Sequence, residues 1–353
     1  MRTFRTLALL LAFLTWVPVV QAAGPYREAA LGALSWIASQ QQPDGSFPGF
    51  GPGSTADAVF AICAVDGDPN GFLQGENSPI TFLAARAGEL ASSPGSAAKV
   101  ILAAVCAGKD PRRFGGTDLV AALEKAYDVR SGSYGADLAG HALVLLALSA
   151  AGRPIPAAAV DYLRQAQTPE GGWAWDGSPA SGGADTNSTA LAVQALRAAG
   201  VVPSDPAVQS ALSYFHTQQN ADGGFPYAKP SPWGSASDTN STAYVVQALL
   251  AAGEDPEGPA WTVEGRTPLS FLRQMQLPSG AFLWQAQVPG ENALATYQAV
   301  PALMLRPFPL ARMSAGEAAL LPATGGPGLG GLGGIFGLGM FLAGLLLRRR
   351  HGR

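Results

Sequence analysis

The sequence is poor in charge. Lys and Arg number 22 and Asp and Glu 25 among 353 residues, which leaves a formal net charge of −3. Nucleic-acid-binding proteins concentrate basic side chains on one face, and this sparse, nearly balanced charge offers no such patch. The composition therefore argues against DNA or RNA as a partner.

Cysteine and histidine are also scarce. The only cysteines are Cys63 and Cys106, which excludes a disulfide-dense scaffold, and no Cys/His cluster has the spacing of a metal site. In an exported protein the two thiols would be able to pair. Both fall late in apolar segments of neighbouring repeats, however, so we expect two buried thiols, no metal ion and no cofactor.

Both ends of the chain carry address signals. Residues 1–22 combine early arginines, an apolar run and small residues before a cleavage point, which predicts a secretory signal peptide. Residues 313–324 form a linker and sorting motif, and residues 325–353 an apolar stretch long enough to cross a bilayer, followed by arginines. The motif resembles the LPxTG signal that sortases cleave and join to the cell wall; an uncleaved membrane anchor is the alternative. With either attachment we expect residues 23–312 to be displayed outside the cell. The residues of the motif are Leu321, Pro322, Ala323, Thr324 and Gly325.

Self-similarity is the strongest internal signal. Five Ala/Leu/Val-rich segments each end in a glycine with a proline shortly after, at intervals of 41 to 53 residues. Glycine takes the left-handed turn at a helix end and proline cannot continue the helix. The spacing predicts one helical hairpin per repeat. The glycines are Gly67, Gly108, Gly152, Gly200 and Gly253.

The other helix of each pair has its own motif: an aromatic, a glutamine five residues on, then glycine and a second aromatic. Four clear units and two degenerate ones, around residues 79–108 and 117–152, give six hairpins. The clear units carry Gln41, Gln167, Gln219 and Gln276, with closing aromatics Phe47, Trp173, Phe225 and Phe282.

The hairpins are expected to close on themselves. The second helix of each pair is apolar nearly all round and must be enclosed, whereas the first keeps polar side chains and would lie outside. No polar capping repeat marks either end, which favours a ring over an open solenoid, and few segments alternate as strands do. We predict an all-α (α/α)6 toroid over residues 23–312, acting as a monomer.

The aromatic-Gln-Gly-aromatic units resemble the QW repeats of squalene–hopene cyclases over residues 26–309. The six-hairpin count resembles the toroids of protein prenyltransferase β subunits and of the cobalamin carriers transcobalamin and intrinsic factor. The cyclases carry D-x-D-D-T-A at the start of an inner helix, and the middle Asp protonates the polyene. This chain has the hexamer Asp-Thr-Asn-Ser-Thr-Ala twice, from Asp185 and from Asp238, so the resemblance places Asn187 and Asn240 where the acid belongs. A carboxamide cannot supply that proton.

The two hexamers also have a structural interpretation. Asp185 and Asp238 each lie fifteen residues before a stop glycine, as does Asp137, which is the pattern of helix N-caps. Inner helix starts would ring the cavity mouth, so ligand contact is compatible with capping. Aligning the last repeat on "VQAL" puts Glu291 in phase with Asn187, and we name Glu291, Asp185 and Asp238 as weak catalytic candidates. The predicted ligand-binding residues are Asp185, Asn187, Asp238, Asn240, Trp175, Tyr227, Trp233 and His141.

The sequence is compatible with two main classes of function, a binding module and an enzyme, and with a structural scaffold as a third. The missing acid, the absent prenyltransferase zinc ligands and the expected export favour a surface-displayed, non-catalytic binding module. Its cavity would take an apolar or planar small molecule, for which the family resemblance offers a bound corrinoid as an example. The alternatives are a terpene-cyclase-like or prenyltransferase-like enzyme, and a rigid surface scaffold.

Overall fold

The structure is a computed structural model that describes residues 24–135, 137–232 and 234–310. The predicted signal peptide, sorting motif and apolar anchor lie outside these residues. Within them, no helix combines the length and the apolar character that a membrane span requires.

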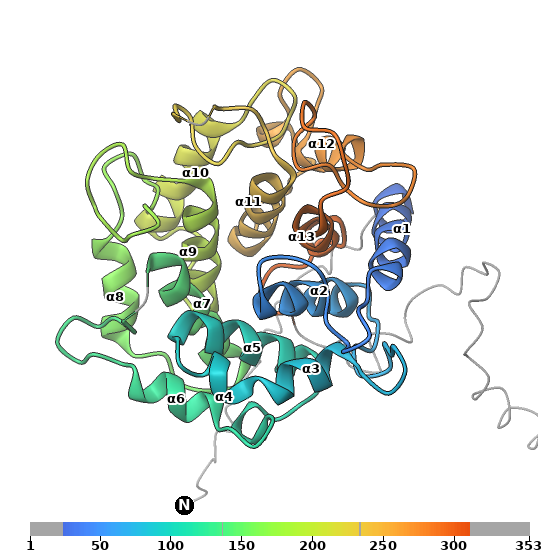
Figure 1. Cartoon of the computed structure of the whole chain (residues 1–353). Coiled ribbons are helices and arrows are strands. Elements are labelled where there is room, and N and C mark those ends of the chain that lie inside the picture. Colours follow the sequence, from blue (N-terminus) through green and yellow to red (C-terminus); the bar gives the residue numbers. More distant parts are fainter. Residues whose placement is uncertain (1–23, 136, 233, 311–353) are drawn as a thin grey trace, which may run out of the picture. The chain divides into compact units, whose positions relative to one another are not determined.

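Six helices form an inner ring (Figure 1). Each packs on the next around the ring, and the last packs on the first. The predicted closure is therefore confirmed. In chain order the inner helices are α2 (Pro52–Ala64), α5 (Pro94–Cys106), α7 (Leu138–Ala150), α9 (Thr186–Ala198), α11 (Thr239–Ala252) and α13 (Ala293–Leu303).

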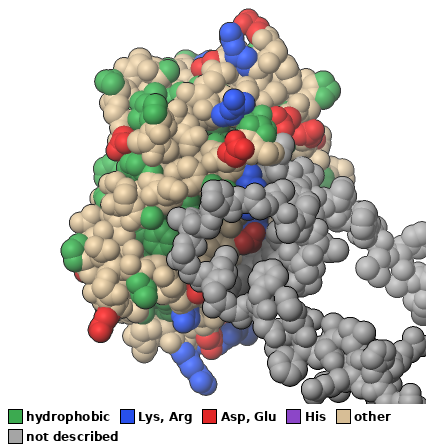
Figure 2. All heavy atoms as spheres, turned by 90° about the vertical axis from the view of Figure 1, so that its right-hand side faces the viewer, with side chains coloured by type: hydrophobic (Ala, Val, Ile, Leu, Met, Phe, Trp, Pro, Cys, Tyr) green, Lys and Arg blue, Asp and Glu red, His purple; other side chains and the backbone are tan. Residues whose placement is uncertain are grey.

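The outer layer alternates with the inner one along the chain, so the all-α toroid is confirmed for the described residues. Two short 3-10 turns, η1 (Pro111–Arg113) and η2 (Pro259–Trp261), lie in the connections. The outer helices are α1 (Gly24–Ser39), α3 (Pro79–Ala85) with α4 (Ala87–Leu90), α6 (Leu119–Lys125), α8 (Ala157–Gln165), α10 (Pro206–Gln218) and α12 (Pro268–Gln274). On the face drawn in Figure 2, acidic and basic side chains are interspersed rather than gathered by sign.

The stop glycines end the inner helices as predicted, with one variation. Gly108, Gly152, Gly200 and Gly253 all have positive φ, the conformation that glycine adopts without strain. At the end of α2 the left-handed residue is instead Asp66, with φ 62°. A Cβ on Gly67 would lie 2.8 Å from the Ile62 side chain, so this glycine is required by close packing and not by its φ.

The repeated glutamines join one repeat to the next. Each glutamine Nε2 donates to the carbonyl of the glycine in its own loop and to a backbone carbonyl of the following repeat. For Gln167 these distances are 2.7 Å to Gly171 O and 2.8 Å to Ala207 O. Gln276 donates at 2.7 Å to Ala29 O of α1, which ties the last outer helix to the first. The motif therefore holds the outer layer together and closes it.

The two cysteines form a disulfide, so the expectation of two buried thiols was wrong. Cys63 and Cys106 are bonded, with their Cα atoms 6.1 Å apart. Each lies near the end of its helix, and α2 and α5 are neighbours in the ring. Successive inner helices run in the same direction, so two residues near the ends of adjacent helices come within bonding reach.

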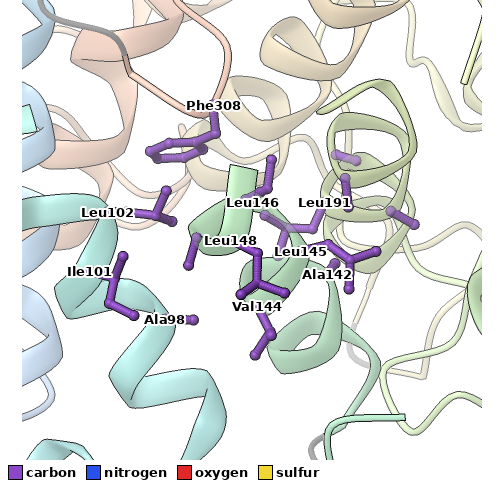
Figure 3. Close-up of a cluster of buried hydrophobic side chains, with 14 of the residues drawn as sticks. Ala98, Ile101, Leu102, Ala142, Val144, Leu145, Leu146, Leu148, Leu191 and Phe308 are labelled. Carbon is purple, nitrogen blue, oxygen red and sulfur yellow. The ribbon is translucent and has the colours of Figure 1, made fainter. Parts of the chain in front are cut away.

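The chain after α13 fills one end of the ring. Phe308 donates its backbone N–H to Gln194 Oε1 at 2.8 Å, and its ring meets Phe60 edge-on at 4.9 Å. Gln247 Nε2 donates to Arg306 O at 2.9 Å. Figure 3 shows Phe308 above the leucines of α5 and α7. Side chains thus occupy this end of the ring, and the pocket described next lies at the N-terminal ends of the inner helices.

Candidate functional site

One pocket of about 510 Å³ opens at the starts of α9, α11 and α13. This volume is within the range of small-molecule sites, roughly 300–1,000 Å³. Of the described residues that line it, none is Lys or Arg, and the one carboxylate is that of Asp238. The lining includes Asn187, Tyr227, Asp238, Asn240, Tyr244, Trp284, Leu294 and Gln298.

Asp238 is both a helix cap and part of the pocket wall. It is 3% exposed and accepts from the backbone N–H and the hydroxyl of Ser241, at 2.7 and 2.8 Å. Removal from water raises its pKa to about 6, although the bonds from Ser241 favour the charged form. The capping interpretation of Asp238 therefore holds together with a position in the pocket.

Asp185 is the same cap in a different setting. It is 1% exposed and accepts from Ser188 N at 2.7 Å. Burial raises its pKa, and the hydroxyl of Tyr227 lies against its carboxylate. Asp185 is not among the described residues that line the pocket, whereas Asn187 from the same hexamer is. Two identical hexamers therefore place their acids in different environments.

A polar chain runs inward from the pocket floor. Asn240 Nδ2 donates to Gln298 Oε1 at 2.8 Å, and Gln298 also hydrogen-bonds to the Asp57 carboxylate. Tyr244 and Gln298 line both the pocket and a smaller cavity beneath it, of about 10 Å³, which Asp57 also lines. Asp57 is 4% exposed and accepts from Lys99 Nζ at 2.6 Å. Burial raises the pKa of Asp57, and the bond from Lys99 opposes that rise.

Sequence reasoning missed Asp57. It lies two residues after the threonine of Ser54-Thr55-Ala56, a third and partial copy of the hexamer's Ser-Thr-Ala end. In the two full copies, the residues at the same distance after the threonine are Leu191 and Tyr244. The signal that would have found Asp57 was this partial copy.

The threonine of each copy has a structural task. Trp173 N donates to Thr189 Oγ1 at 2.9 Å, and Phe225 N donates to Thr242 Oγ1 at 2.9 Å. Thr55 and Thr296 accept in the same way from Phe47 and Phe282. In α2, α9, α11 and α13, a buried threonine hydroxyl therefore joins the helix to the loop that precedes it.

His141 takes this threonine's place in α7 and does not face the pocket. It is fully buried, with Nε2 3.0 Å from Ala159 O of α8 and its ring centroid 4.7 Å from that of Tyr162. Burial lowers its pKa to about 4. The expectation that His141 faces the cavity is therefore wrong, because this position points toward the outer layer.

Glu291 was assigned the wrong phase. The cap of α13 is Asn292, which accepts from Ala295 N at 2.9 Å, so Asn292 corresponds to Asp185. On that register Leu294, which lines the pocket, corresponds to Asn187. Glu291 precedes the cap on the surface, and hydrogen bonds from Ser279 and Trp36 lower its pKa. It is therefore not a cavity acid.

Three rim aromatics occupy matched positions, each two residues after the closing aromatic of its loop. The carbonyls of Trp175, Tyr227 and Trp284 accept from the first N–H of the preceding inner helix, at 2.9, 2.8 and 2.9 Å. Their side chains stay 60, 37 and 40% exposed. Tyr227 and Trp284 line the pocket, and Trp175 lies outside it. Trp284 was not predicted, and Trp233 lies outside the described residues.

The described residues form an α/α toroid with an aromatic-rimmed pocket at the N-terminal ends of its inner helices. Residues 129–292 match the model of the squalene-hopene cyclase C-terminal domain. This segment contains α7, α9 and α11 with both hexamers.

Individual proteins are also similar to this chain. Drimenyl diphosphate synthase from Streptantibioticus cattleyicolor is 34% identical over 128 residues, which are 36% of this chain and 22% of that relative. The chain thus aligns with about a fifth of that relative's length. A type II terpene cyclase from Scytonema, in complex with geranylgeranyl dihydroxybenzoate, has a TM-score of 0.57 at 15% identity, covering 80% of this chain and 97% of that one. A glycosidase in complex with glucose has a TM-score of 0.52 at 16% identity, covering 80 and 98%. At such identities the structural likeness concerns the fold alone.

Proposed function

We propose that the toroid is a terpene-cyclase-like enzyme that holds an isoprenoid chain in the pocket and protonates it from Asp238. The comparisons support this reading better than the non-catalytic binding module that the sequence favoured. The observation that carries it is a buried carboxyl with a raised pKa in an aromatic pocket.

The pKa of Asp238 suits a proton donor. A general acid must hold its proton near the working pH. An ordinary Asp, with a pKa of about 3.9, is protonated in roughly one molecule in a hundred at pH 6. Asp238, with its pKa at about 6, is protonated in about half. The donor in this proposal is the first Asp of the motif and not the middle position, where this chain has Asn240.

The pocket wall suits a cationic intermediate. Protonation forms a C–H bond at an alkene carbon and leaves a cation, which the next double bond attacks. Loss of a proton from the cyclised cation restores the acid, so the net reaction is an isomerisation. Tyr227, Tyr244 and Trp284 line the pocket, and aromatic faces attract cations by about 0.5–2 kcal/mol each.

The pocket volume suits a small ligand. The pocket, at about 510 Å³, has the size of a small-molecule site, roughly 300–1,000 Å³. We propose a C15 isoprenoid as the substrate.

The test compares Asp238→Asn with the matched control Asp185→Asn. Asparagine keeps an oxygen for the cap, so both variants should fold. Wild type incubated with farnesol at pH 6 should give cyclised product by gas chromatography and mass spectrometry. Asp238→Asn should lose at least 100-fold of that rate, and Asp185→Asn less than 5-fold. Equal losses in the two variants, or product from Asp238→Asn at the wild-type rate, would reject Asp238 as the donor.

A second candidate is the non-catalytic binding module that the sequence favoured, in which an apolar or planar molecule binds unchanged. The observation that favours it is that both oxygens of Asp238 lie in bonds that cap α11, one to Ser241 N and one to the Ser241 hydroxyl. Saturable farnesol binding with full recovery of farnesol would select this candidate. For either function we propose, from the terminal signals alone, that the toroid is displayed outside the cell.

A further inference from the structure

The pocket offers little to an anion. Its described lining includes Asp238 and neither Lys nor Arg. The nearest lysine along the chain, Lys229, already donates its ammonium to Gln219 O at 3.1 Å and to Asn220 Oδ1 at 3.2 Å. A phosphorylated head group in the pocket would lie beside the Asp238 carboxyl, with no Lys or Arg among the described lining residues to neutralise its charge.

The helix starts around the pocket do not replace those cations. Exposed N–H groups at a helix N-terminus bind anions, but here side chains and loops already take them. Ser241 N donates to Asp238 and Ala295 N to Asn292. Thr239 N, the first of α11, donates to the carbonyl of Trp284.

The hydrogen-bonded side chains beneath the pocket floor determine which atom of Asn240 faces the pocket. Lys99, whose side chain is 24% exposed, donates from Nζ to Asp57 Oδ2 at 2.6 Å. Gln298 Nε2 donates to the Tyr244 hydroxyl at 3.3 Å, and the same amide hydrogen-bonds to Asp57, so its NH2 group faces these two partners and its oxygen faces Asn240. Asn240 then donates at 2.8 Å, which leaves its own carbonyl oxygen for the pocket.

We infer that the pocket selects a neutral head group that donates a hydrogen bond, an alcohol rather than a phosphate ester, and that Asp57 sets this preference through Gln298 and Asn240. This inference rests on the proposed isoprenoid-binding function and names its substrate class. Asp57 is a positioning residue, because it acts on the ligand only through two amides.

The test measures the dissociation constants of full-length protein for farnesol and for farnesyl diphosphate. Wild type should bind farnesol at least 10-fold more tightly. Asp57→Asn replaces an oxygen by an NH2 group that can donate to Gln298 while the remaining oxygen accepts from Lys99, so the two amides can reverse and the preference should fall at least 5-fold. The matched control is Asp137→Asn, since Asp137 caps α7 by accepting from Gly140 N at 2.6 Å and is not among the described lining residues. It should keep the wild-type preference.

A second variant keeps the inference testable should Asp57→Asn unfold. Asn240→Leu retains the size of the side chain and removes its acceptor, so it should also lose at least 5-fold of the preference for farnesol. Tighter binding of the diphosphate by wild type would overturn the inference. So would an unchanged preference in a folded Asp57→Asn or in Asn240→Leu.

These outcomes are separable from those of the proposed function. Cyclisation of farnesyl diphosphate with weak farnesol binding would overturn the head-group inference and keep the enzyme. Tight farnesol binding without product would support the inference and reject the enzyme.

Discussion

The buried carboxyl of Asp238 should make stability depend on pH in a defined direction. Its pKa is about 6 in the folded protein and about 3.9 in the unfolded chain. Because the folded state binds the proton more tightly, the free energy of unfolding falls as pH rises from about 4 to about 6. That interval is about two pH units at about 1.4 kcal/mol each, so the loss from this group is about 3 kcal/mol.

Asp238→Asn removes this dependence, since the amide does not titrate. The assay is urea denaturation of wild type and variant at pH 4, 5, 6 and 7. Other buried carboxyls, Asp57 and Asp185 among them, titrate in both proteins and cancel in the difference. Relative to wild type, the variant should gain about 3 kcal/mol between pH 4 and pH 7. A constant difference between the two proteins across this range would refute the raised pKa.

Further predictions follow from the repeats and the chain ends. Gly280→Ala should lower the free energy of unfolding by well over 1 kcal/mol, because its Cβ would lie 2.3 Å from a backbone oxygen of α1. Gly182→Ala, with positive φ but nothing within 4 Å, should cost only about 1 kcal/mol of conformational strain. Urea denaturation of both variants measures the difference, and equal losses of stability would contradict the steric explanation. Replacing Cys63 and Cys106 by serine opens a link across 43 residues and should lower stability by about 2–4 kcal/mol; a melting temperature unchanged from the oxidised wild type would argue against the bond. Thr324→Ala should leave the protein extractable by detergent rather than bound to cell wall, and complete extraction of wild type by detergent would reject sortase attachment.

The repeats could be predicted because their signals are local. A stop glycine, a following proline and a glutamine five residues after an aromatic each report on a few neighbouring residues. The cap at Asp238 is equally local, since it accepts from Ser241 three residues on. These features determine hairpins, and the absence of polar end repeats then indicates closure.

The site depended on contacts that no local pattern reports. Asp57 matters through Lys99, 42 residues away, and through Gln298 at the other end of the chain. Glu291 was misplaced because the apolar residues of α9 and α13 align nearly as well when one helix is shifted by one helical turn. Asn292, the cap that sets the true register, does not repeat the Asp of the other copies.

The glutamine that joins α12 to α1 means that the toroid has no first or last repeat. In an open solenoid the end repeats hold a single interface and unfold first. Here the loss of any one hairpin breaks two interfaces, because the last inner helix also packs on the first. Truncation at either end should therefore remove the whole fold in one cooperative step, and a partly unfolded toroid with an intact remainder should not accumulate.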